Sequence, residues 1–189
     1  PGASSYDAVV SGVKSLIDRY DFIDKDRIAL NGHSWGGYQI AFLVTRTNMF
    51  KAAVSGAPVV NMTSAYGGIR WESGKSRMFQ YEQTQSRIGG TLWDKPAEFI
   101  RNSPLFFLPQ VQTPVLIMHN DKDGSVMWEQ GIEFFMALRR LDKPVWLFNY
   151  KGEGHHLKKW ENRLDYSRRV MEFYDYYLKD GKKPEWMKS

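Results

Sequence analysis

The sequence predicts an α/β fold with a mostly parallel sheet and helices on both faces. Short apolar runs of strand length alternate along the chain with longer segments whose apolar residues recur at helical spacing. Strands that are joined through helices form right-handed βαβ units, and this connectivity produces parallel sheets. The strand candidates are almost continuously apolar, which is typical of strands that are covered on both faces.

The first expected element is a helix that begins near Ser4-x-x-Asp7 and carries a core-facing apolar stripe up to Tyr20. No strand candidate precedes it. The later elements are expected in this order: a strand over residues 27–31, a helix over 35–47, strands over 50–57 and 114–119, a helix over 129–141, a strand over 145–150 and a helix over 162–178.

The stretch from Val59 to Gln112 is far longer than an ordinary crossover between strands. Long insertions in compact domains are usually functional loops or lids. This one is rich in aromatic residues and glycines, which favours either the wall of an apolar pocket or ordinary packing of helices onto the sheet.

Composition excludes several classes of protein. The 189 residues are 42% hydrophobic and 15% aromatic, which suits one domain with a sizeable core and argues against intrinsic disorder. No apolar run approaches the roughly 20 residues that a membrane-spanning helix needs. The chain has no cysteine, so it cannot contain a disulfide, a thiol nucleophile or a cysteine-based zinc finger. A chain of this kind is compatible with both the cytoplasm and the periplasm, and its compartment stays open.

The chemistry is concentrated in Gly32-His33-Ser34-Trp35-Gly36-Gly37, a G-x-S-x-G motif directly after a strand and at the start of a helix. This context is the one that a nucleophile elbow of an α/β-hydrolase fold requires. The sharp turn holds the serine hydroxyl clear of the sheet, and flanking glycines avoid collisions with neighbouring backbone. The sequence therefore predicts Ser34 as a nucleophile and the backbone N–H of Trp35 as one donor to an oxyanion.

A serine nucleophile needs a base and an orienting carboxylate, and in this fold they follow in the order serine, acid, histidine, each after a strand. Asp121 and Asp123 come just past the third strand candidate, and either satisfies this order.

The chain contains four histidines, which makes the search for the base short. His33 is inside the elbow and is expected to point away from the nucleophile. His119 ends a strand candidate and is expected to be packed there. His155 and His156 follow the fourth strand, so the base is expected at one of them.

These motifs resemble the catalytic domain of the prolyl oligopeptidase family of serine peptidases, which includes dipeptidyl peptidases and acylaminoacyl peptidases. The resemblance covers nearly the whole chain. It rests on these segments: Pro1-Gly2-x-Ser4, Gly32-His33-Ser34-Trp35-Gly36-Gly37-Tyr38, Asn102-Ser103-Pro104-Leu105, the H-G-x-x-D-x-x-V-like run from His119 to Val126, and Glu153-Gly154-His155.

The resemblance implies which acid and which base are used. The family's aspartate stands four residues after the histidine of that run, which selects Asp123, and its base follows Glu-Gly, which selects His155. Two positions depart from the family pattern: Asn120 replaces a glycine, and His156 stands where a small residue is common. His156 therefore stays an alternative base.

The resemblance also implies an acyl-enzyme mechanism on oligopeptide substrates without a cofactor. The family's second oxyanion donor is a tyrosine upstream of the elbow, on a segment that this sequence does not contain. Family pockets for the substrate side chain are lined by aromatic residues after the second strand. By that likeness, the substrate-binding candidates are Tyr66, Trp71, Tyr81 and Val126.

Residues 1–189 are accordingly expected to be the C-terminal part of an α/β-hydrolase catalytic domain, with the N-terminal hydrolase strands missing. The family places a β-propeller before this domain, and we expect one upstream. With one oxyanion donor, the chain alone is expected to be weakly active or inactive. An uncovered sheet edge invites self-association, so a homodimer is also expected.

Three alternative functions are compatible with the sequence to different degrees. The same elbow serves esterases and other acyl hydrolases, and the chain can also be a non-catalytic interaction module. Nucleic-acid binding is disfavoured because the net charge of +5 is spread along the chain. No histidine pair has metal-ligand spacing on a helix and no glycine-rich phosphate loop is present, so neither a metal nor a cofactor is expected.

Overall fold

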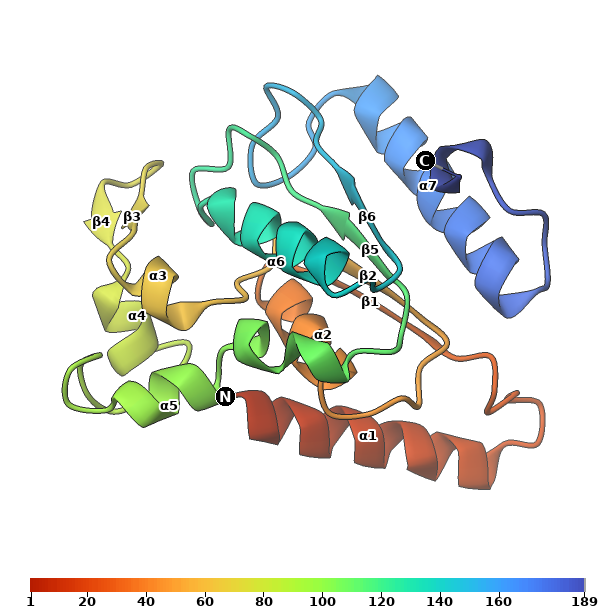
Figure 1. Ribbon diagram of the computed structural model, residues 1–189, viewed down its shortest axis with the longest axis horizontal. Coiled ribbons are helices and arrows are strands. Elements are labelled where there is room, and N and C mark those ends of the chain that lie inside the picture. The colour runs from red at the N-terminus through yellow and green to blue at the C-terminus, as the bar shows by residue number, and fades with distance from the viewer. Residues whose placement is uncertain (189) are drawn as a thin grey trace.

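The computed structural model describes residues 1–188 and contains a four-stranded parallel sheet (Figure 1). Its strands, in spatial order, are β1 (Ala29–His33), β2 (Ala52–Gly56), β5 (Val115–Met118) and β6 (Val145–Phe148). All three neighbouring pairs are parallel, so the four carboxyl ends meet at one edge of the sheet. The predicted parallel α/β architecture is confirmed.

Helices cover both faces of this sheet (Figure 1). On one face lie α2 (Trp35–Val44), α6 (Glu129–Arg140) and the 3-10 helix η1 (Pro104–Gln110), whose buried residues join the strands in one apolar cluster. On the other face lies α7 (Trp160–Leu178), which packs through Val170 and Phe173. α1 (Gly2–Arg19) packs against α2, and its Val10 joins a small apolar cluster that also includes Leu30 of β1.

The long insertion between β2 and β5 folds into small elements that gather at one side of the molecule (Figure 1). They are α3 (Met62–Tyr66), β3 (Ile69–Arg70), β4 (Lys75–Ser76), α4 (Met78–Glu82) and α5 (Pro96–Arg101). β3 and β4 form an antiparallel hairpin. A further 3-10 turn, η2 (Glu185–Met187), follows α7 near the end of the chain.

Two details of the expected helices differ in the structure. α1 begins at Gly2, and the Ser4 hydroxyl donates to the carbonyl of Pro1 instead of capping the helix. The predicted apolar stripe of α1 is buried mainly in its first half, since Leu16 and Tyr20 near its end are 48% and 45% exposed.

No helix in the described part of the chain has the length and apolar character to span a membrane. β1 has a strand neighbour on one side, β2, and its other edge is unpaired among residues 1–188.

Candidate active site

Ser34 occupies the sharp junction between β1 and α2. Its backbone has φ 61° and ψ −118°, a conformation that is rare for a residue with a side chain. The turn is held by the Ser34 N–H, which donates to the carbonyl oxygen of Gly56 on β2 at 2.8 Å. The serine hydroxyl does not cap α2 and is free for other partners. Trp35 is the first residue of α2, so its backbone N–H has no acceptor within the helix.

Two glycines of the elbow are required by close backbone contacts. A Cβ at Gly32 would lie 2.8 Å from the backbone of Gly36, and a Cβ at Gly37 would lie 2.4 Å from the carbonyl oxygen of Gly56. Nothing lies within 4 Å of a Cβ at Gly36. The steric requirement predicted for both motif glycines therefore holds at Gly32 but not at Gly36. The second glycine that close backbone contacts require is Gly37.

Asp123 lies in the loop after β5 with its side chain fully buried. Its Oδ1 accepts backbone N–H groups from Ser125 at 2.9 Å and Val126 at 2.8 Å. Burial alone raises the pKa of Asp123, but hydrogen bonds from His119, His155 and the Val126 N–H outweigh burial and hold the pKa well below its usual range. Asp123 is therefore a carboxylate at neutral pH.

His155 lies in the loop after β6 and bridges the acid and the serine. Its Nδ1 is 2.7 Å from Oδ2 of Asp123, and its Nε2 is 2.8 Å from Oγ of Ser34. Because the carboxylate only accepts, Nδ1 carries the proton and Nε2 is left as the acceptor for the serine hydroxyl. The structure thus brings together three of the predicted site residues from three separate loops at the carboxyl edge of the sheet.

The loop that carries His155 is anchored by Glu153, a residue to which the sequence pattern assigns no role. Its carboxylate is buried and accepts the N–H groups of Lys158 at 2.8 Å and Lys159 at 2.9 Å and the side-chain amide of Asn162 at 2.7 Å. These contacts, led by the Lys158 N–H, lower the pKa of Glu153. The glutamate directly precedes Gly154-His155, so the E-G-H motif itself was the available signal.

Asn120 connects the two loops that present the acid and the base. Its side-chain amide donates to the carbonyl of Gly154 at 2.8 Å and accepts the N–H of Tyr150 at 3.0 Å. The residue that departs from the family's glycine therefore fixes the spacing between the loop after β5 and the loop after β6.

His119 is buried at the end of β5, as expected, and it also touches the acid. Its Nε2 lies 3.2 Å from Oδ2 of Asp123 and 3.2 Å from the carbonyl oxygen of Val126. Both partners are acceptors, which places a proton on Nε2. His119 thus adds a second imidazole donor to the buried carboxylate.

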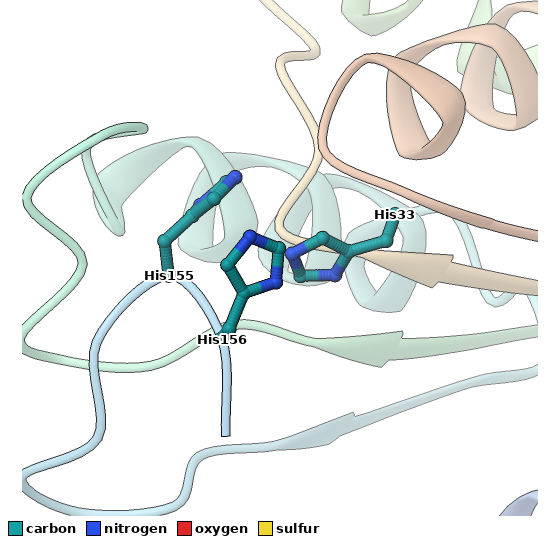
Figure 2. A group of neighbouring side chains, drawn as sticks. All are labelled: His33, His155 and His156. Carbon is teal, nitrogen blue, oxygen red and sulfur yellow. The ribbon is translucent and has the colours of Figure 1, made fainter. Parts of the chain in front are cut away.

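The two remaining histidines lie closer to the site than the sequence suggested. The ring of His33 is 4.8 Å from that of His155 and 4.7 Å from that of His156 between centroids. The rings of His155 and His156 are 4.9 Å apart (Figure 2). The expectation that His33 points away is wrong, because the loop after β6 turns back over the elbow and brings the rings of both its histidines beside His33.

This trio is the place in the described residues where side chains could hold a metal ion, since the candidate nitrogens lie within 4.8 Å of one another. Both ring nitrogens of His155 are already engaged, however. Burial and the neighbouring His155 and His156 lower the pKa of His33 to about 4, against smaller raising effects of Asp123 and the His155 backbone. His33 is therefore neutral at physiological pH.

A cavity of about 50 Å³ opens beside Ser34. Its apolar side is formed by Trp35, Val59 and Val126. Its polar side is formed by Arg70, Arg77, Gln80, Gln85 and Ser125, contributed mainly by the long insertion. The insertion therefore does line the site, but with polar rather than aromatic residues.

Of the four predicted substrate-binding residues, one lines this cavity and three do not. Val126 lines this cavity. Tyr66 and Tyr81 are buried in the apolar cluster of α3, α4 and α5, at 2% and 1% exposure, where Tyr66 also donates to Glu82. Trp71 is 71% exposed to solvent. The two tyrosines therefore pack the insertion together, and none of the three aromatic candidates lines the cavity beside Ser34.

The comparison with known families agrees with this geometry. The model of the prolyl oligopeptidase family matches residues 1–181, which is nearly the whole chain. The chain belongs to the prolyl oligopeptidase family. The matched residues include the elbow at Ser34, the loop after β5 with Asp123, the loop after β6 with His155 and the long insertion.

Curated relatives match most of the chain. The uncharacterized peptidase YuxL of Bacillus subtilis is 31% identical over 162 residues, which are 84% of this chain and 23% of the relative. The acylamino-acid-releasing enzyme of Homo sapiens is 30% identical over 152 residues, 77% of this chain and 20% of the relative. The chain thus spans about a quarter of the length of the relatives that it matches.

Solved structures with the same fold include the acylaminoacyl peptidase of Pyrococcus horikoshii, with a TM-score of 0.82 at 21% identity over 97% of this chain and 29% of that one. The dipeptidyl peptidase 4 of Porphyromonas gingivalis has a TM-score of 0.79 at 22% identity over 94% of this chain and 23% of that one. At such identities these likenesses establish the fold, which is part of an α/β-hydrolase fold.

Proposed function

We propose that this chain carries the catalytic triad of a serine peptidase that cleaves oligopeptides through an acyl-enzyme. The observation that supports this most directly is the unbroken path from Oγ of Ser34 to Nε2 of His155 at 2.8 Å and from Nδ1 of His155 to Oδ2 of Asp123 at 2.7 Å. Three groups of the required types meet in the order that nucleophilic catalysis needs.

In the proposed reaction, Nε2 of His155 takes the proton of the Ser34 hydroxyl while Oγ attacks the carbonyl carbon of the scissile bond. Asp123, ionised and buried, holds the ring in the tautomer with Nδ1 protonated and stabilises the imidazolium that forms. His155 then gives its proton to the leaving amine, and the peptide's acyl group stays on Ser34. A water molecule, deprotonated by the same nitrogen, releases the acyl group and restores the hydroxyl.

The negative charge of the tetrahedral intermediate requires donors beside the nucleophile. The backbone N–H of Trp35 lies at the start of α2, where the helix dipole favours negative charge, and we assign it as one donor. The second donor is expected from a segment of the complete protein that is outside this chain, together with the first strands of the hydrolase sheet and a β-propeller.

Peptide substrates are favoured over other acyl compounds by the relatives. These relatives include an acylamino-acid-releasing enzyme and a dipeptidyl-peptidase 5, of which this chain spans 20% and 25%. The proposed substrates are therefore oligopeptides, and no cofactor has a role in the proposed steps.

The test uses the full-length protein that contains this chain. A fluorophosphonate probe is expected to label the wild type and to leave Ser34→Ala unlabelled. Ser4→Ala, which removes an exposed hydroxyl on α1, is the matched control and is expected to label like the wild type.

Turnover of aminoacyl and dipeptidyl anilides beside p-nitrophenyl esters then separates peptidase from esterase. Hydrolysis of esters with no anilide cleavage contradicts the peptidase function and supports an acyl hydrolase. A wild type that the probe does not label contradicts any catalytic function and supports an interaction module.

A further inference from the structure

The cavity beside Ser34 contains a buried positive charge. Arg77 is 3% exposed and lines the cavity. Its guanidinium donates to the carbonyl oxygen of Ser125 and, through Nε, to the Tyr81 hydroxyl at 3.4 Å. Within residues 1–188 no carboxylate lies within 4.0 Å of it. Buried charges are normally paired, because an uncompensated one is strongly destabilising.

Glu72, an exposed residue, already has a hydrogen-bond partner. Its Oε2 accepts the Ser125 hydroxyl at 2.9 Å, and the same hydroxyl oxygen accepts from Arg70 at 3.2 Å. Glu72 and the half-buried Arg70 therefore meet through one hydroxyl group. This arrangement balances Arg70 and leaves the charge of Arg77 without a counter-ion.

A second polar group in the same cavity has no hydrogen-bond partner among residues 1–188. Gln80 lines the cavity, and its side-chain oxygen is buried and accepts no hydrogen bond from residues 1–188. A half-turn of the amide would present its two N–H donors at this place instead. Arg77 and Gln80 lie three residues apart across α4, so both side chains reach the same space from one turn of helix.

We propose that this cavity binds the side-chain carboxylate of an acidic residue, so that the enzyme cleaves after glutamate or aspartate. This inference rests on the proposed function, because it places the side chain of the residue whose carbonyl Ser34 attacks. The methylene groups of such a side chain pass along Val59 and Val126, and its carboxylate meets Arg77 and the Gln80 amide. A carboxylate satisfies the buried guanidinium, whereas an apolar side chain would leave it unpaired.

The lining of the cavity agrees with this occupant. The cavity is small, about 50 Å³, and most of the side chains around it are polar. The expected aromatic lining, which would favour apolar side chains, is turned into the packing of α3, α4 and α5.

The experiment measures how fast peptidyl diphenyl phosphonates inactivate the full-length protein. Their side chain at the phosphonate is varied to match glutamate, glutamine, leucine, phenylalanine or proline. Each probe modifies the nucleophilic serine directly, so the selectivity of the cavity is measured even if amide turnover is slow. We expect the glutamate analogue to react about 100-fold faster than the leucine analogue, because a site built for hydrogen bonds rejects a group without them.

Three variants test the residues. Arg77→Gln is expected to lower the rate with the glutamate analogue about 100-fold and the rate with the glutamine analogue much less, so that the preference for glutamate over glutamine is lost. Gln80→Leu, which removes no charge from the core, is expected to lower the glutamate rate about tenfold. Arg101→Gln changes an exposed arginine on α5 and is expected to have no effect. Fluorophosphonate labelling reports whether each variant retains a folded site.

The outcomes separate the two proposals. Faster inactivation by the phenylalanine or proline analogue than by the glutamate analogue overturns the acidic selectivity and leaves the serine peptidase function intact. Glutamate selectivity that persists in labelled Arg77→Gln and Gln80→Leu overturns the assignment to this cavity. If neither the phosphonates nor the fluorophosphonate modifies Ser34, the proposed function fails and this inference fails with it.

Discussion

Nε2 of His155 lies 2.8 Å from Oγ of Ser34, although 121 positions separate the two residues. His156, the neighbouring imidazole, contacts the rings of His33 and His155 and makes no hydrogen bond to the serine in the described part of the chain. We predict that His155→Ala lowers kcat by about 10⁴–10⁶-fold. His156→Ala is the matched control and is expected to stay within about threefold of wild type, since ring contacts alone move no proton. Steady-state hydrolysis of a peptide anilide measures both, and a larger loss in His156→Ala would assign the base to His156.

Asp123 and Asp121 are close in sequence but differ in what they hold. Asp123 faces Nδ1 of His155, whereas Asp121 accepts the N–H of Gly152 at 2.7 Å in an exposed loop. Asp123→Asn places an amide donor opposite Nδ1 and forces the wrong tautomer, so kcat is expected to fall about 10⁴-fold. Asp121→Asn keeps its acceptor oxygen and is expected to change kcat less than fivefold, about 1 kcal/mol. Equal losses in the two variants would contradict the assignment of Asp123.

Local residues account for the parts of the molecule that the sequence predicts best. The strand, the strained turn at Ser34 and the helix after it follow from a short motif whose close contacts lie within a few positions and on the adjacent strand. The choice of Asp123 over Asp121 and of His155 over His156 rests on the resemblance to a family. Local sequence patterns cannot make this choice, because they do not specify the backbone conformation that sets where a loop side chain points.

The remaining parts depend on long-range packing. The geometry of the elbow alone predicts that His33 points away, and the loop that brings two further histidine rings beside it comes from beyond β6. Tyr66 and Tyr81 belong to an aromatic-rich segment, which is typical of a pocket wall. Whether such a ring lines a cavity or fills a core depends on how the insertion folds on itself. Glu153 and Asn120 act by joining loops, and such contacts leave no periodic signal in a sequence.

Glu153 is expected to hold the histidine loop in place. Its buried carboxylate accepts three N–H groups, and Glu153→Ala leaves them unpaired. We predict a loss of about 1–3 kcal/mol in the free energy of unfolding and a lower kcat, because His155 is two residues away. Glu161→Ala, an exposed glutamate in the first turn of α7, is the control and is expected to change the free energy of unfolding by less than about 0.5 kcal/mol. Chemical denaturation with kcat measured in parallel tests this, and an unchanged kcat in Glu153→Ala would contradict a positioning role.

His33 makes the stability of this domain depend on pH. Its pKa in the folded state is lowered to about 4, below the ordinary value of 6.5, by burial and by His155 and His156. Between these pH values the unfolded chain binds more protons at this residue, so stability falls as the pH is lowered from about 6.5 to about 4. After allowance for partial exposure, we predict that acidification from pH 7 to pH 4.5 costs the wild type about 1–2 kcal/mol more than it costs His33→Gln. Unfolding of both proteins at the two pH values measures this, and an equal acid loss would contradict a neutral His33.

The unpaired edge of β1 is expected to make the 189-residue chain associate with itself when it is produced alone. An open strand edge presents unpaired N–H and C=O groups that pair readily with a second copy. We predict a dimer by light scattering, with turnover about 10²–10³-fold below that of the full-length protein because one oxyanion donor is missing. Asn31→Lys puts a charge at an exposed position of β1 and is expected to restore a monomer, whereas Asn48→Lys, exposed outside the strand, is expected to leave the dimer unchanged. A monomeric wild-type chain would contradict association through this edge.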